Sequence, residues 1–284
     1  MTSTSKAPVL FVSHGAPTFA IEPGMLGPAL QKLGHQLPPL KAVLVVSPHW
    51  QTNGVAVMTT VAPETVHDFG GFPASLFRLQ YPAAGHPDLA REAAGLLEAS
   101  GIATQFDERR GLDHGAWVPL MHLLPQANLP VFQVSMPFNL STDQALQMGQ
   151  ALAPLREQGV LIVASGSMTH NLYEVRQPAS APLAYAQEFT HWIRKAVRAN
   201  AVSSLIQYRS EAPDAERAHP TQEHFIPLLV ALGATGDDDA VQLLEGGITH
   251  GVLSMDSYVW GFMHRNEIVD MTDGAHLGIV NSEQ

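Results

Sequence analysis

The sequence contains no cysteine, and this absence excludes several kinds of chemistry at once. A chain of 284 residues without a thiol forms no disulfide bond, no cysteine-ligated zinc or iron–sulfur site and no cysteine nucleophile. It also suits a reducing compartment. The first apolar run, Pro8–Val12, is too short for the hydrophobic region of a signal peptide, so we expect a cytoplasmic location.

Charged residues and long apolar runs are also scarce. Asp, Glu, Lys and Arg make up 14% of the chain, against roughly 25% in ordinary soluble proteins. The formal net charge of −11 repels phosphate backbones, so we expect no nucleic-acid partner. No run approaches ~18 uninterrupted apolar residues, so we expect no transmembrane helix and no membrane partner. A hydrophobic share of 45% nevertheless predicts a large core and excludes disorder.

The glycine patterns of nucleotide-binding proteins are missing as well. There is no Gly-x-Gly-x-x-Gly and no Walker pattern, so no nucleotide cofactor is expected. Ser13 and Ser47 lie outside the Gly-x-Ser-x-Gly turn that carries a hydrolase nucleophile. What the chain does have is histidine: 14 residues, nearly as many as the 15 Lys and Arg together. Without cysteine, this abundance favours metal binding or proton transfer by imidazole.

Short β-rich runs alternate with helical patterns along the chain. The expected strands are Pro8–Val12, Ala42–Val46, Val55–Thr60, Ile102–Phe106, Pro130–Val134 and Val160–Ala164. The expected helices are Asp88–Ala99, Thr142–Gln158, Leu183–Ala199 and a segment that contains Pro227–Leu232. The strongest strands are continuous apolar runs, as in strands buried on both faces. We therefore predict an α/β fold in which helices flank a largely parallel or mixed central sheet.

We see no convincing linker, and the whole chain, 1–284, is expected to form one catalytic domain. Its core is expected to span about residues 9–260. Residues 265–284 are expected to form an irregular tail.

Three histidines follow predicted strands directly. His14 comes after the first strand, His49 after the second, and His170 shortly after Val160–Ala164. The carboxyl ends of buried strands face the crevice where α/β proteins bind ligands, so these imidazoles are expected to meet there. The competing interpretation of each is a buried histidine with satisfied hydrogen bonds and a structural role.

Four further histidines lie in loops that suit a binding site. His219 and His224 are separated by four residues just before a predicted helix, and the neighbouring Glu223 is a further possible metal ligand. His114 lies in a tight glycine-containing loop, and His67 lies in a long loop of the length seen in lids. The remaining histidines are expected to be surface or packing residues: His35, His86, His122, His191, His250, His264 and His276. Three neutral imidazoles suit Zn(II), Fe(II) or Cu(II) equally.

Six short motifs occur in one order along the chain. They are Ser13-His-Gly-Ala-Pro17, Ser47-Pro-His-Trp50, His67-Asp-Phe-Gly-Gly-Phe-Pro73, Leu112-Asp-His-Gly-Ala-Trp117, Ser165-Gly-Ser-Met-Thr-His-Asn-Leu172 and Glu223-His-Phe-Ile-Pro227. Together they resemble the class III extradiol ring-cleavage dioxygenases of the LigB superfamily, in particular the branch of 4,5-DOPA extradiol dioxygenase-like proteins. The resemblance runs from Val9 to Met255 and implies a LigB-like fold.

The resemblance also implies roles for individual residues. The implied metal ligands are His14, His49 and His224. His170 corresponds to the acid–base residue, and His114 to a residue that binds the substrate or its oxygen intermediate. The protocatechuate-cleaving relatives use two histidines and one glutamate, whereas the third ligand here corresponds to His224, as in the DOPA branch. Three further residues are candidates for contacts with the substrate: His67, His219 and Trp50.

The implied reaction is the opening of a catechol ring by O2 beside its two hydroxyl groups, which gives a semialdehyde. Fe(II) is the metal expected for activity, Zn(II) is possible in the protein as isolated, and no organic cofactor is needed. The expected partners are a small, DOPA-like aromatic diol and O2. The same three histidines also suit a zinc hydrolase, which would act without O2, or a non-catalytic binding protein on the same scaffold. The sequence leaves the native metal, the side chain of the catechol, the position of ring cleavage and the oligomeric state open.

Overall fold

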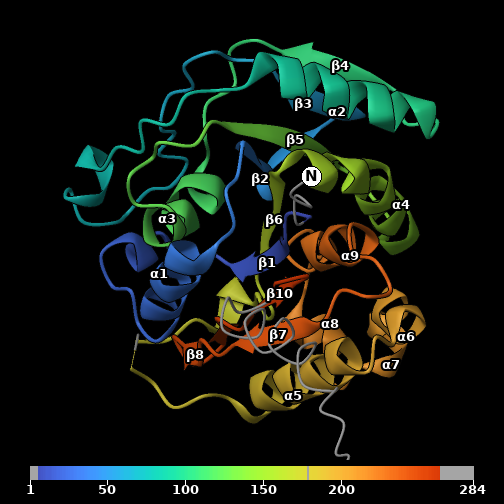
Figure 1. The fold of residues 1–284 in the computed structure, drawn as a ribbon. Helices are drawn as coiled ribbons and strands as arrows, with labels where there is room; N and C mark the ends of the chain where they lie inside the picture. Colours follow the sequence, from blue (N-terminus) through green and yellow to red (C-terminus); the bar gives the residue numbers. More distant parts are fainter. Residues whose placement is uncertain (1–5, 178, 263–284) are drawn as a thin grey trace, which may run out of the picture.

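A mixed β-sheet forms the centre of the protein, of which a computed structural model describes residues 6–177 and 179–262 (Figure 1). Eight strands of the described residues form this sheet in the order β4-β3-β5-β2-β6-β1-β10-β7. Their bounds are β1 Val9–Ser13, β2 Ala42–Thr52, β3 Val55–Met58, β4 Thr104–Asp107, β5 Val131–Pro137, β6 Val160–Gly166, β7 Val241–Leu244 and β10 Ser257–Trp260. A short hairpin, β8 Ile248–Thr249 with β9 Leu253–Ser254, stands apart from the sheet.

The middle of the sheet is parallel and its edges are mixed. β5, β2, β6 and β1 are neighbours and run in one direction. β10 and β7 add antiparallel pairs on one side, and β3 pairs antiparallel with β5 on the other. All residues of β1 and β6 are buried, as their continuous apolar runs predict. The carboxyl ends of β2, β6 and β1 therefore lie side by side.

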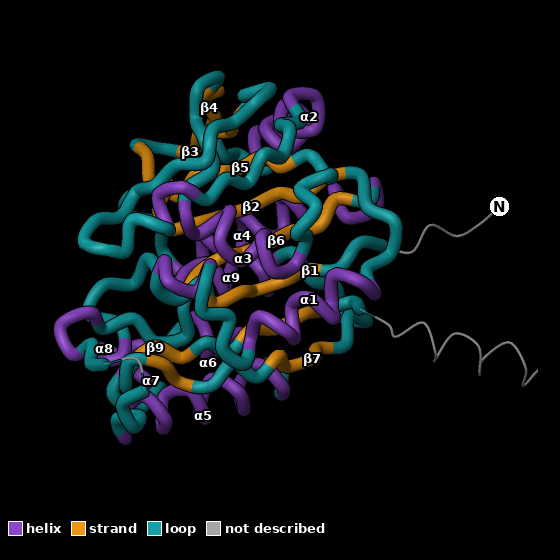
Figure 2. The backbone as a smooth tube through the Cα atoms, turned by 90° about the vertical axis from the view of Figure 1, so that its left-hand side faces the viewer, coloured by secondary structure: helices purple, strands orange, loops and turns teal. Residues whose placement is uncertain are grey.

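Helices cover both faces of the sheet. Their bounds are α1 Leu26–Gln36, α2 Pro87–Ala99, α3 His114–Leu123, α4 Thr142–Leu152, α5 Ala184–Arg198, α6 Val202–Ile206, α7 Tyr208–Glu211, α8 Ala215–Ala218 and α9 Ile226–Gly233. In Figure 1, α1 and α3 lie on one side of the sheet and α4 and α9 on the other. Figure 2 views the molecule from the side of α1, where the strands run behind the helices. In the described ranges, no helix combines the length and hydropathy needed to cross a membrane.

The predicted α/β fold with a mixed, helix-flanked sheet is confirmed, with corrections to single elements. The helix expected over Thr142–Gln158 ends at Leu152 and continues as a 3-10 turn over Ala153–Gln158. Pro154 explains the change, because its ring has no N–H to continue the α-helical ladder. The strand expected over Ile102–Phe106 is shifted to Thr104–Asp107.

Several elements were not predicted. They are α1, α3, α6 to α8, and β7 to β10. α3 is buried on almost every side and contains Pro119, so it lacks the amphipathic pattern by which helices are recognised. The irregular tail expected at 265–284 lies outside the described residues.

Candidate metal centre

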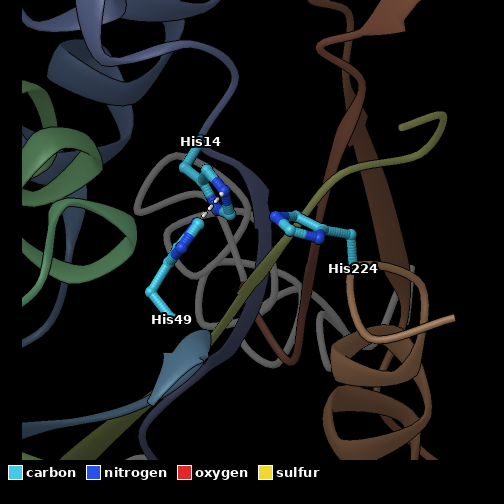
Figure 3. A group of neighbouring side chains, drawn as sticks. All are labelled: His14, His49 and His224. Atoms are coloured by element: carbon cyan, nitrogen blue, oxygen red, sulfur yellow. Dashed lines mark hydrogen bonds between the residues drawn. The ribbon is translucent and has the colours of Figure 1, made fainter. Parts of the chain in front are cut away.

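Three histidines from distant parts of the sequence point toward one another (Figure 3). His14 directly follows β1, His49 lies near the carboxyl end of β2, and His224 lies two residues before α9. Nitrogen atoms of the three rings all lie within 4.8 Å of one another. Nε2 of His14 and Nε2 of His49 lie 3.1 Å apart and share a hydrogen bond. The parallel strands β1 and β2 and the loop before α9 thus bring together the three residues proposed from sequence as metal ligands.

The proton position on His14 follows from its neighbours. Pro119 within α3 has no N–H to donate to the carbonyl of Gly115, and that oxygen accepts a hydrogen bond from Ser165 Oγ at 2.5 Å. The hydroxyl proton of Ser165 is thereby used, so His14 Nδ1, 2.8 Å from the same oxygen, is the donor to it. His14 therefore carries its proton on Nδ1 and leaves the lone pair of Nε2 facing the site.

His224 has the same arrangement. Its Nδ1 donates to Oε1 of Glu223 at 3.0 Å, which leaves Nε2 unprotonated. Nε2 is buried and has no hydrogen-bond partner among the described residues. The sequence suggested Glu223 as a further metal ligand. In the structure its carboxylate accepts a hydrogen bond from Nδ1 of His224.

The donor set fits a divalent transition metal. In the metal-free protein Nε2 of His49 donates its proton to the unprotonated Nε2 of His14 at 3.1 Å. A metal that displaces this proton would find both nitrogens, together with the unpartnered Nε2 of His224, facing one region. Two nitrogens bound at ~2.0–2.1 Å to one tetrahedral ion lie roughly 3.3 Å apart, close to the observed separation. Three imidazoles also leave coordination positions free for substrate, as in catalytic rather than structural sites.

Burial keeps these imidazoles in the neutral form that binds metals. Desolvation, reinforced by the neighbouring histidines, lowers the pKa of His14 and of His224 well below the ordinary value of 6.5. Desolvation also lowers the pKa of His49 to about 4, with His114 as the next cause. At neutral pH no proton competes with a metal for these nitrogens.

His170 and His114 border the three histidines from two sides. The ring of His170 stacks on that of His224 with centroids 3.4 Å apart and planes 10° from parallel. Burial lowers the pKa of His170 to about 4, although the charge of Glu223 opposes this shift. The ring of His114, at the first residue of α3, lies 3.9 Å from that of His49 and 5.5 Å from that of His14. The structure thus brings all five histidines into one cluster.

Asp68 also belongs to this cluster, although the sequence analysis did not single it out. Its Oδ1 accepts hydrogen bonds from the backbone N–H of His114 at 3.0 Å and from His114 Nδ1 at 2.9 Å. Its Oδ2 lies 3.8 Å from Nδ1 of His49. Burial alone would raise the pKa of Asp68, but the bonds from His114 outweigh it and lower the pKa to about 2. Asp68 lies in the motif His67-Asp-Phe-Gly-Gly-Phe-Pro73, next to the predicted site residue His67, so the motif itself contained the signal.

The structure does not bring the three substrate candidates into ring contact with the cluster. His67 donates from Nε2 to the carbonyl of Leu79 at 3.0 Å and packs among aromatic rings of its own loop. His219 is fully buried and donates to the carbonyl of Met168 at 3.0 Å. Trp50 is buried beneath the guanidinium of Arg110, 5.1 Å from its ring centre. A role for these three residues in substrate binding stays a prediction.

The fold and the histidine cluster define a class of α/β protein in which several buried imidazoles, able to hold a metal, meet at one edge of a mixed sheet. The chain belongs to the LigB family, because the family model described as the catalytic LigB subunit of aromatic ring-opening dioxygenase matches residues 12–259. The extradiol dioxygenases of this family are metal-dependent, and the resemblance predicted from the six motifs is confirmed.

Individual relatives agree with this assignment. The chain is 39% identical over 254 residues to a 4,5-DOPA dioxygenase extradiol from Beta vulgaris, covering 87% of this chain and 94% of that protein. It is 36% identical over 257 residues to a protein of the same name from Escherichia coli K12, covering 89% and 94%. The crystal structure of an uncharacterized protein from Escherichia coli K12 superposes with a TM-score of 0.75 at 32% identity, covering 89% of this chain and 99% of the other.

Proposed function

We propose that this protein is an Fe(II)-dependent extradiol dioxygenase that opens the ring of a catechol with a DOPA-like side chain. Both atoms of O2 enter the product, and the carbon–carbon bond beside the two hydroxyl groups breaks to give a semialdehyde. The relatives named 4,5-DOPA dioxygenase extradiol support the choice of substrate. The observation that carries the proposal is the convergence of three neutral imidazoles, with an orphaned nitrogen on His224, beside two further histidines.

In this proposal His14, His49 and His224 hold the metal, each through Nε2. The bound metal supplies Lewis acidity that lowers the hydroxyl pKa of a catechol, together with one-electron chemistry toward O2. Ser165 and Glu223 fix the ligand orientation, because each accepts the Nδ1 proton of one ligand. Hydrogen-bond partners of this kind typically change metal affinity 10–100-fold when they are removed.

His170 is the proposed acid–base residue. It is stacked on His224, and its low pKa leaves an unprotonated ring nitrogen at neutral pH that can accept a proton from a catechol hydroxyl. The backbone N–H of His170 donates to the carbonyl of Ala218 at 2.8 Å, which fixes this residue relative to the loop before His224. The same ring nitrogen can return the proton as the ring opens.

His114 is the proposed donor beside His49. Its Nδ1 proton is used by Asp68, so Nε2 is the nitrogen available to substrate oxygens. The ring of Phe69 stands edge-on to His114, with centroids 5.7 Å apart and planes at 90°. Phe69 also contacts Phe72 and Phe77, so an aromatic wall adjoins the cluster where a planar catechol ring would lie.

The experiment that tests the proposal is oxygen uptake with DOPA and a small panel of catechols. The protein is reconstituted anaerobically with Fe(II), and a Zn(II)-loaded sample is measured in parallel. We expect uptake and a yellow ring-opened product in the iron sample alone. A reaction that proceeds equally well under argon would instead support a zinc hydrolase. Retention of full metal content after His14→Ala, His49→Ala and His224→Ala would show that the proposed ligand set is wrong.

A further inference from the structure

The loop that carries Asp68 is fixed against the start of α3 by main-chain bonds. The backbone N–H of Val66 donates to the carbonyl of Leu112, and the N–H of Leu112 donates to the carbonyl of Glu64, both at 2.8 Å. Thr65 and Leu112 form an isolated parallel bridge. These bonds hold Asp68 beside the first residue of α3, so the position of its carboxylate is set by backbone pairing.

The two oxygens of this carboxylate face two different histidines. Oδ1 accepts both the backbone N–H and the Nδ1 proton of His114, at 3.0 and 2.9 Å. Oδ2 faces Nδ1 of His49 at 3.8 Å, beyond a hydrogen bond but close enough to favour a proton on that nitrogen. Once a metal displaces the proton between Nε2 of His49 and Nε2 of His14, a proton on Nδ1 of His49 leaves both Nε2 lone pairs for the metal.

We propose that Asp68 is a positioning residue that sets the tautomers of His114 and His49 together. Oδ1 directs Nε2 of His114 toward the substrate, and Oδ2 directs Nε2 of His49 toward the metal. The assignment of substrate and metal to these nitrogens rests on the proposed function. The tautomers are read in the zinc-loaded protein without substrate or O2, so they are tested separately from the dioxygenase activity.

Two variants of Asp68 distinguish the role of Oδ1, which faces His114, from that of Oδ2, which faces His49. In Asp68→Asn the amide oxygen can still accept both protons of His114, while the amide NH2 then faces the Nδ1 proton of His49. We expect the His114 tautomer to be retained and the zinc affinity to fall ~10-fold, within the range for partners of metal-ligating histidines. Asp68→Ala removes both oxygens, so we expect mixed tautomers of His114 and a fall in zinc affinity of ~10–100-fold.

The readouts do not depend on catalysis. Long-range ¹⁵N–¹H correlation spectra of the zinc-loaded protein report which nitrogen of each histidine is protonated, and competition with a chelator gives the zinc affinity. Asp107→Asn is the matched control, because Asp107 Oδ1 also accepts two backbone N–H groups, those of Arg109 and Arg110, and is not among the contacts of the cluster. The control is expected to leave both readouts unchanged.

Wild-type tautomers and zinc affinity in Asp68→Ala would overturn the proposal. So would equal losses in Asp68→Asn and Asp68→Ala with the His114 tautomer lost in both, because the two oxygens would then have no separate roles. A wild-type protein that consumes no O2 with any catechol would count against the proposed function alone. The spectra would still decide the role of Asp68.

Discussion

Two carboxylates hold the start of α3, and their surroundings differ. Asp113 is fully buried, and its oxygens accept from Ser47 Oγ, Arg110 Nη2, Gln133 Nε2 and the N–H of Ala116. Asp68 is 24% exposed, and the side chains it faces are His114 and His49. The first carboxylate joins a helix to two strands, and the second joins a loop to the cluster. Asp113, with its many fixed donors, mainly joins elements of the fold, although its charge also raises the pKa of His49, whereas Asp68 contacts an imidazole of the cluster directly.

Removal of each carboxylate is expected to give the largest difference between the two positions, in the free energy of unfolding. Asp113→Ala leaves Arg110 and Gln133 without their acceptor and removes the N-cap of α3, so we expect a loss of about 4–6 kcal/mol in the free energy of unfolding. Asp68→Ala is expected to lose at most about 2 kcal/mol, because water reaches its site. Urea denaturation of the metal-free proteins measures both. If Asp113→Ala does not fold, Asp113→Asn, which retains a cap acceptor, should show a smaller loss. Equal losses at the two positions would contradict the division.

Two histidines extend the comparison from carboxylates to imidazoles. His170→Ala is expected to retain metal and to lose ~10²–10⁴-fold in turnover, the usual contribution of a general acid–base residue. His219 packs among Phe189, Tyr208 and Phe225. His219→Leu removes its hydrogen bond to the carbonyl of Met168 and should lower the free energy of unfolding by about 1–3 kcal/mol. Metal analysis, steady-state kinetics and denaturation of both variants test this. A rise in KM without lost stability in His219→Leu would make His219 a substrate contact, as the resemblance implied.

The sequence predicted those parts of the fold and site that depend on local pattern. Continuous apolar runs identified the central strands, and the positions of His14, His49 and His170 after such runs predicted their meeting at one edge of the sheet. Parallel strands in one sheet make that inference reliable, because their carboxyl ends share an edge.

Other parts depend on pairing between distant segments, which no local pattern carries. Asp68 reaches His114 only because Thr65 pairs with Leu112, 47 residues further along the chain. The Ser165 contact to His14 depends on a carbonyl of α3 that faces Pro119 without an N–H. α3 itself is buried almost all round, so its hydrophobic pattern has no polar face to reveal it.

The pH dependence of stability is a further way to compare His219, in the core, with the histidines of the cluster. Burial lowers the pKa of His219 to about 3, below the ordinary 6.5 of the unfolded chain. The unfolded state therefore binds more protons below pH 6.5, and the stability that neutral His219 contributes is present above pH 6.5 and lost as the pH falls. At pH 5.5 each such histidine lowers the free energy of unfolding by about 1.4 kcal/mol relative to neutral pH. His49 and His170, with pKa values of about 4, should add similar losses.

Thermal unfolding of the metal-free protein between pH 7.5 and 5.5 measures the sum. Zinc should reduce the part that arises from the cluster, because a bound metal excludes protons from its ligands. The part from His219 should persist with zinc and disappear in His219→Leu. A metal-free protein whose stability is independent of pH in this range would contradict the neutral state of these histidines.

Two buried serines differ in the same way as the two carboxylates, and their expected effects are the smallest. Ser165 Oγ accepts a hydrogen bond from Nδ1 of His14 and donates one to the carbonyl of Gly115. Ser47 Oγ instead donates to Oδ1 of Asp113 at 2.7 Å. Ser165→Ala should lower zinc affinity ~10-fold, because His14 loses the acceptor that fixes its tautomer. Ser47→Ala should cost about 1 kcal/mol in stability and leave zinc affinity within about twofold, because its hydroxyl belongs to the Asp113 network. Chelator competition and urea denaturation on both variants give all four values. The inverse result, with zinc affinity lost in Ser47→Ala and retained in Ser165→Ala, would mean that the Asp113 network also orients the ligands, since the backbone N–H of His49 lies 3.3 Å from Ser47 Oγ.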